Sequence, residues 1–342
     1  MKEIFGKAGA LKKEYDWVKA AELYEQALSM VGKKDFLKKG EVQEKIGYCF
    51  HRAAFQAESR EEFRERMQRA VEAYEKAHGF YEKLADAQKT ARMFRCGAVA
   101  KYLGYWLVSD PSGKRKLLDE SLELEGKALT AFWNLGDTQE YGKTYSDIPL
   151  VFRLRGFYEW DGQTLKGIIE EGTRWGEKAI VALSELGDLC GIARAYCVLA
   201  TCLFFNEYCF IAELEEKEKN HLKVVKYLSK AVDISEKLGD AFLLGMAHLW
   251  LGINTGGEES IRHFEKTLEC GEKTRNNFLK AGGLDFLAYR TAWKSFAAED
   301  PDQRARLGEK AMEFYDRAQH HYKIMSFLSP RGGIIAPPGG YA

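Results

Sequence analysis

Apolar positions along the chain follow the period of an α-helix. Between residues 70 and 84 they recur at steps of four and three, which places them on one face of a helix. These positions are Ala70, Tyr74, Ala77, Tyr81 and Leu84. The alternation typical of strands does not occur before residue 329. The pattern therefore predicts an all-α chain.

One motif within this helical pattern is repeated. It ends in an Asp and carries a Lys-Ala pair ten and nine residues earlier. Its four copies end in Asp86, Asp137, Asp188 and Asp240, at spacings of 51, 51 and 52 residues. A nearly constant spacing over four copies identifies an internal repeat. The chain is predicted to be an array of like units.

Helix start signals divide this array into pairs of helices. Ser59 followed by Glu62 has the pattern of a capping box, and Asp110-Pro111 places a proline at the first helical position after an acidic cap. We expect seven hairpins of two antiparallel helices, at 1–34, 35–86, 87–137, 138–188, 189–240, 241–277 and 278–328. Because stacked hairpins share a continuous core, residues 1–328 are predicted to form a single domain.

Aligning the units on the repeated Asp reveals a column of small residues, each followed three positions later by a ring. The small residues are Ala91, Gly142, Ala193 and Gly245, and the rings are Phe94, Tyr145, Tyr196 and His248. A small residue lets two helices approach closely, and a ring at i+3 packs on the same face. We predict that the four small residues occupy equivalent buried contacts.

These columns resemble the tetratricopeptide repeat (TPR) family. Tyr24 followed by Ala27, and Tyr74 followed by Ala77, are similar to its second-helix aromatic and alanine. The resemblance extends to about residue 328 and implies a right-handed superhelical solenoid with a concave groove. The period of 51 residues here exceeds the family's usual period of about 34, which implies longer helices.

Pro149 falls inside the first helix expected for the unit 138–188. Proline removes a backbone donor and its ring clashes with the preceding turn. We therefore expect a kink or a restart after Ser146-Asp147. The break either adjusts the curvature of the superhelix or widens its concave face.

The column six residues after the repeated Asp is basic in three consecutive units. It contains Arg92, Lys143 and Arg194, followed by Met246 in the next unit. These side chains point about 100° away from the small column, which by the TPR resemblance is toward the concave groove. Family members use a comparable basic set to bind a peptide carboxylate. The expected groove-binding set also includes Gln88, Arg95, Gln139 and Ser146. Alternatively, the cations form ion pairs with Asp or Glu of adjacent units.

Composition and charge narrow the possible functions. Lys plus Arg equals Asp plus Glu, at 51 each, and the signs alternate along the helices, which argues against nucleic acid or an acidic membrane as partner. No run of about 18 apolar residues occurs, so we expect no membrane span. The first residues lack the pattern of a signal peptide. Seven cysteines without a C-x-x-C pair suit the reduced thiols of a cytoplasmic protein.

The sequence offers little support for catalysis or metal binding. Gly142-Lys143-Thr144 lacks the glycine spacing and the preceding strand of a phosphate-binding loop. Asp316 and His320 could present two metal ligands on one helix face, but a third ligand is not evident. Four cysteines fall in one expected helix without a pair at i+3 or i+4: Cys190, Cys197, Cys202 and Cys209. We expect no cofactor, no metal and no enzymatic activity.

A non-catalytic protein- or peptide-binding scaffold that uses the concave groove is the predicted function, and an acidic or carboxylate-ended segment is the expected ligand. One alternative is an all-α enzyme or small-ligand sensor with a site among the 20 Phe, 17 Tyr and 7 Trp residues. Another is a structural module that associates with itself. A closed pocket with convergent polar groups would favour the enzyme or sensor, and an open trough would favour the scaffold.

Residues 329–342 form a Pro/Gly-rich C-terminal tail, in which the helical period stops. The tail contains three of the six prolines in the chain. Either it folds back so that Ile334 and Ile335 cover the last hairpin, or it is a flexible linker, since this density of Gly and Pro is typical of irregular chain.

Overall fold

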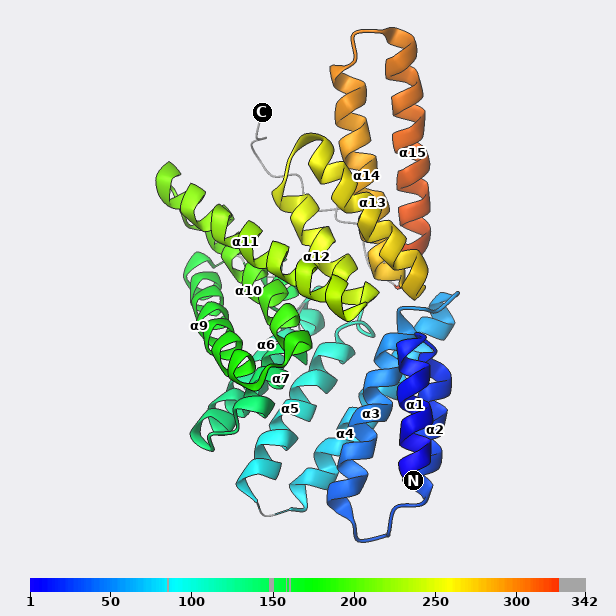
Figure 1. Ribbon diagram of the computed structural model, residues 1–342, viewed down its shortest axis with the longest axis vertical. Helices are drawn as coiled ribbons and strands as arrows, with labels where there is room; N and C mark the ends of the chain where they lie inside the picture. Colours follow the sequence, from blue (N-terminus) through cyan, green and yellow to red (C-terminus); the bar gives the residue numbers. More distant parts are fainter. Residues whose placement is uncertain (85, 148–150, 158, 160, 326–342) are drawn as a thin grey trace.

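The chain is all-α, as the sequence predicts. The computed structural model describes residues 1–84, 86–147, 151–157, 159 and 161–325, and in these ranges it contains helices and connecting segments without strands (Figure 1). The helices are α1 (Lys2–Lys13), α2 (Trp17–Ser29), α3 (Phe36–Ala54), α4 (Arg60–Glu82), α5 (Ala87–Gly104), α6 (Pro111–Asn134), α7 (Thr138–Asp147), α8 (Val151–Phe157), α9 (Gly162–Leu186), α10 (Leu189–Cys209), α11 (Leu214–Leu238), α12 (Ala241–Asn254), α13 (Gly257–Thr274), α14 (Asn277–Ala297) and α15 (Pro301–Ile324).

These helices form the seven hairpins expected from the sequence. The last boundary is displaced by one residue, because α14 begins at Asn277. In the fourth hairpin the first arm contains α7 and α8, and the kink or restart expected after Ser146-Asp147 falls on residues 148–150, outside the described residues. Pro149, which motivated that expectation, lies outside the described residues, and so does the tail from residue 326 onward.

A glycine and an aspartate explain why helices end and restart at the repeated motif. The glycine before the Asp adopts a positive φ of 66–67° in three copies. Glycine adopts this conformation at little steric cost, because it has no Cβ. The Asp then caps the next helix. Asp188, for example, accepts the N–H of Gly191 at 2.9 Å. The repeated Asp therefore begins one helix directly after the preceding helix has ended.

The column of small residues is buried, as predicted. Ala91 and Ala193 are 0% and 1% exposed, and Gly142 and Gly245 are buried as well. A Cβ at Gly142 would lie only 2.4 Å from Cγ of Leu183 in α9. Any side chain at this position would therefore push α7 away from α9.

The array closes on itself, which the sequence did not predict (Figure 1). The backbone N–H and the side-chain amide of Asn277 donate to the carbonyls of Phe55 and Ala57, each at 2.7 Å. Gln56 donates to the carbonyls of Tyr15 at 3.0 Å and Thr274 at 2.7 Å. One apolar core continues from the first hairpins into the sixth and seventh. The first helices of distant hairpins are consequently brought together.

Among the described helices, α10 is long and apolar enough to cross a membrane by length and composition. Its most apolar window has a mean hydropathy of 1.6, and 61% of that window is buried inside the protein. The helix packs against α7, α9 and α11. Burial among other helices therefore accounts for its apolar surface.

Replacing Gly142 with Leu tests this packing. Because a Cβ there would meet Leu183, we expect the free energy of unfolding to fall by about 1–3 kcal/mol. The control is Gly79→Ala in α4, where a Cβ meets nothing within 4 Å and removing a flexible residue should stabilise the helix by about 0.5–1 kcal/mol. Equal denaturation midpoints for Gly142→Leu and the wild type would contradict the assigned contact.

Candidate functional site

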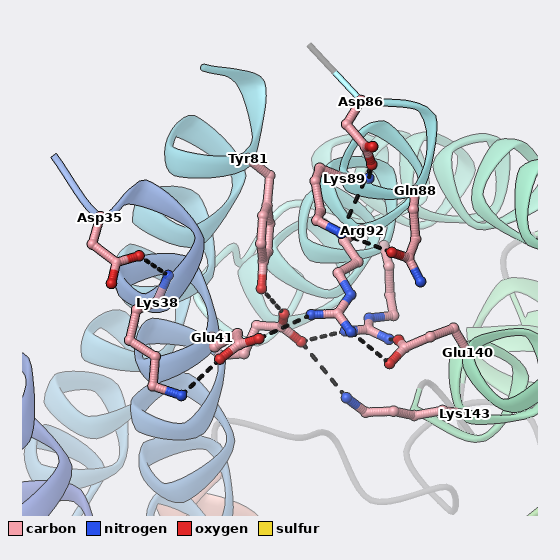
Figure 2. A network of polar contacts seen from close by, with 12 residues as sticks. Asp35, Lys38, Glu41, Tyr81, Asp86, Gln88, Lys89, Arg92, Glu140 and Lys143 are labelled. Carbon is pink, nitrogen blue, oxygen red and sulfur yellow. Dashed lines mark hydrogen bonds and ion pairs between the residues drawn. The ribbon is translucent and has the colours of Figure 1, made fainter. Parts of the chain in front are cut away.

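The inward faces of α3, α5 and α7 meet in a set of ion pairs (Figure 2). We call this set the inner network, and its members are Glu41, Glu44, Arg92, Arg95, Glu140 and Lys143. Arg92 lies 3.0 Å from Glu140 and 3.7 Å from Glu41. These six members carry three positive and three negative formal charges, and Lys38 of α3 adds a further cation 2.9 Å from Glu41.

Arg95 is the most deeply buried member of the inner network. Its side chain is 2% exposed and binds both Glu44 and Glu140. A charge removed from water is costly unless opposite charges and hydrogen bonds compensate it. Two carboxylates from two different helices supply that compensation, so Arg95 joins α3 to α7 across α5.

The electrostatics keep both of these carboxylates ionised. Burial alone would raise the pKa of Glu44, but the charges of Arg95 and Lys143 and a 2.5 Å hydrogen bond from Tyr81 outweigh it and lower the pKa to about 2. Burial opposes the ionisation of Glu140 too, yet the neighbouring cations hold its pKa below the ordinary value. Glu44 and Glu140 are therefore both ionised near neutral pH.

The residues predicted for groove binding do not form a single cluster. Arg92, Arg95 and Lys143 belong to the inner network, where they form the ion pairs that the alternative interpretation expects. Ligand binding by them stays a prediction. Lys143 keeps 47% of its side chain exposed. Arg194 donates instead to the hydroxyl of Tyr48 at 3.3 Å, farther along α3.

The three uncharged members of the predicted set have other roles or partners. Gln88 donates to the carboxylate of Asp137 at 2.7 Å, which links the starts of α5 and α7. Ser146 is buried and donates to the carbonyl of Lys143 at 2.9 Å, so it satisfies a helix carbonyl. Gln139 is exposed.

Sequence reasoning missed the anionic half of the inner network. Glu41 and Glu44 lie in α3, before the first of the four aligned copies, although Asp35 caps α3 one repeat before Asp86 and places them in the columns of Arg92 and Arg95. Their spacing of three residues was a second available signal, because it puts both carboxylates on one helix face.

A second buried ion network, also missed, fixes α8. Arg155 is 2% exposed and binds Asp119 of α6 and Glu159. Arg115 of α6 reaches Glu159 at 3.1 Å. These contacts hold the short helix α8 against α6.

The candidate metal ligands are separated. His320 and Asp316 are exposed, whereas His321 contacts the side-chain oxygen of Asn277 at 2.9 Å. Of the cysteines in α10, Cys197 and Cys202 are buried. In the part of the chain that the structure describes, no three His, Cys, Asp or Glu residues are gathered in a way that could hold a metal ion.

Two surface depressions lie away from the inner network. The larger has a volume of about 530 Å³, opens to solvent, and is lined mainly by α6 and α9, including Lys127 and Trp175. The smaller, of about 270 Å³, lies between α2, α3 and α4. Neither is lined by a residue of the predicted groove-binding set.

A scan against protein-family models finds no match, and a search of the curated proteins finds none either. Among solved structures, the chain is similar to aspartyl phosphate phosphatase F from Bacillus subtilis, with a TM-score of 0.52 and 16% identity over 97% of this chain and 71% of that one. It is also similar to a signal transduction ATPase with numerous domains from Pyrococcus horikoshii that has a TPR sensor, with a TM-score of 0.50 and 16% identity over 92% of this chain.

The fold is TPR-like. At 16% identity, these similarities concern the fold alone, and this chain spans only 41% of the archaeal protein. The TPR-like array here has long helices, with 25 residues in both α9 and α11, which accounts for the long repeat.

Glu44→Gln tests the electrostatic role of the inner network. We expect the free energy of unfolding to fall by about 3 kcal/mol at neutral pH. This is the lower end of the range for breaking a buried ion pair, because Glu140 still pairs with Arg95. The pKa of Glu44 is lowered from 4.5 to about 2, so its stabilising effect is complete above pH 4.5 and disappears as the pH falls through 2. The difference between wild type and variant should therefore shrink on acidification.

Chemical denaturation across an acidic pH series measures this difference. Glu123→Gln is the matched control, because Glu123 is 66% exposed and pairs with Lys127 on the surface of α6. A Glu44→Gln deficit that stays constant on acidification, or one no larger than that of the control, would contradict the assigned role.

Proposed function

We propose that this chain is a non-catalytic module that binds a protein or peptide partner at the inward faces of its first helices. The observation that carries the proposal is the pre-organised charge on those faces. Arg92 and Arg95 are held by carboxylates on both sides, so little side-chain freedom remains to be lost on binding. A TPR-like array supports such a role because it offers a large curved surface.

We further propose that the bound segment is acidic or ends in a carboxylate. Lys143 supports this chemistry because nearly half of its side chain remains exposed, although Glu44 lies 3.7 Å away. An ammonium group that keeps this exposure remains available to a second anion. The module would act as an adaptor or as the sensor part of a regulatory protein in the cytoplasm, and its free thiols suit that compartment.

Neutralising Lys143 tests the proposal. Lys143→Gln is preferable to charge reversal, which would place another carboxylate beside Glu44. Partners captured by the immobilised wild-type chain are identified by mass spectrometry, and the affinity of the purified partner is then measured for each variant. We expect Lys143→Gln to bind roughly two- to five-fold more weakly, with a smaller difference at high salt.

Lys178→Gln is the control, because Lys178 lies on the second helix α9, over the ring of Trp133 at 4.3 Å. It should bind the partner as the wild type does. Equal affinities for the wild type and Lys143→Gln at low salt would refute a role for Lys143. If no partner is captured reproducibly, the binding proposal itself fails.

A further inference from the structure

Arg52 is a buried cation that forms no ion pair with any residue the structure describes. It lies in the last turn of α3 and is 9% exposed. Among the residues that the structure describes, none forms a hydrogen bond or an ion pair with its guanidinium, and Nε is buried without a partner. Arg95 and Arg155, the two deeply buried arginines described above, each bind two carboxylates. Leaving a buried charge uncompensated is costly, so Arg52 calls for a specific explanation.

Two aromatic rings hold the Arg52 guanidinium in place. Its central carbon lies 3.4 Å from the ring centroid of Phe242 and 5.4 Å from that of Trp17. Stacking on a ring stabilises the cation through the ring face, while the N–H groups at the edge of the guanidinium plane stay free to donate. The two terminal nitrogens, unlike Nε, keep contact with solvent.

A second guanidinium lies one turn away. Tyr48 precedes Arg52 by four residues on α3, and its hydroxyl accepts a hydrogen bond from Arg194 of α10 at 3.3 Å. Burial lowers the pKa of Arg52, Tyr48 and the carboxylate of Asp240 oppose this shift, and the positive charge of Arg194 adds a smaller lowering effect.

Further positive charge surrounds the two arginines. The ammonium of Lys12 lies 5.2 Å from the ring centroid of Tyr48. After the effect of burial, Lys12 and Lys143 lower the pKa of Lys45, whereas the carboxylates of Glu44 and Glu41 raise it. The carboxylate of Asp240 acts on Arg52 from a distance but caps α12, where it accepts two N–H groups at 3.1 Å.

We propose that Arg52 and Arg194, with the hydroxyl of Tyr48, form an oxyanion-binding site for a carboxylate or phosphoryl group of a ligand. Guanidinium groups bind both kinds of oxyanion through pairs of parallel hydrogen bonds. The bound anion compensates the buried charge of Arg52. The site lies where α3 meets α10 and α12, so it exists only because the array is closed.

Small anions test the site without a partner. The melting temperature of the chain is measured against inorganic phosphate, and separately against a peptide rich in Asp and Glu with blocked ends, at constant ionic strength set with chloride. The variants are Arg52→Met, which retains an apolar stem against Phe242, and Arg194→Gln. Arg174→Gln is the control, because Arg174 is 65% exposed on α9.

We expect the anion to raise the melting temperature of the wild type and the control in a saturable manner, as binding to the native state requires. Arg52→Met should show no anion-dependent rise, yet melt at or above the wild-type temperature without anion, because an uncompensated buried charge has been removed. Arg194→Gln should need a higher anion concentration. A response to phosphate alone assigns a phosphoryl ligand, and a response to the peptide alone assigns a carboxylate.

Two results would overturn the proposal. One is that neither phosphate nor the acidic peptide raises the melting temperature of the wild type more than that of Arg52→Met. The other is an Arg52→Met variant that melts lower than the wild type without anion and keeps the full anion response, which would make Arg52 a packing residue. The inference rests on the proposed function only in placing the ligand on the inward faces, and because the experiment contains no protein partner, its failure leaves partner binding by Lys143 standing.

Discussion

The contacts of Asn277 with the segment between α3 and α4 determine the rest of the architecture. Its backbone and side chain donate to the carbonyls of Phe55 and Ala57, residues 222 and 220 positions earlier in the chain. Stacked hairpins ordinarily contact only their neighbours and leave the ends of the array apart. Here two short hydrogen bonds join the seventh hairpin to the second, and α3 consequently lies among the first helices of the later hairpins.

Because α3 is enclosed by other helices, the charged side chains on its inward face need partners of opposite charge. The N-terminal half of that face carries Glu41 and Glu44, which α5 and α7 neutralise with arginine and lysine. The C-terminal half carries Lys45, Tyr48 and Arg52, and the contacting helices add further cations. One helix face is thus balanced at one end and electropositive at the other.

Much of the fold was predictable because its determinants are local and repeated. The helical period, the Asp caps and the small residues each act within one hairpin or between neighbours, so they recur at a fixed spacing that a single sequence reveals. Closure and charge pairing are different. Arg92 donates a hydrogen bond to Glu140, which lies 48 residues later in the chain. Arg194 donates one to Tyr48, which lies 146 residues earlier. Neither of these distances is a multiple of the repeat, whereas Arg92 and Glu41, and Arg95 and Glu44, are each separated by one repeat of 51 residues.

The end of the basic column has the same physical origin as the closure. Arg92, Lys143 and Arg194 occupy it in three successive units, and Met246 follows in the fourth. Met246 is 4% exposed and belongs to the apolar core shared by the first and last hairpins. A cation at that position would be buried in this core without a counter-ion, at a cost that a methionine avoids. The column therefore changes from basic to apolar at the unit where the array meets its own beginning.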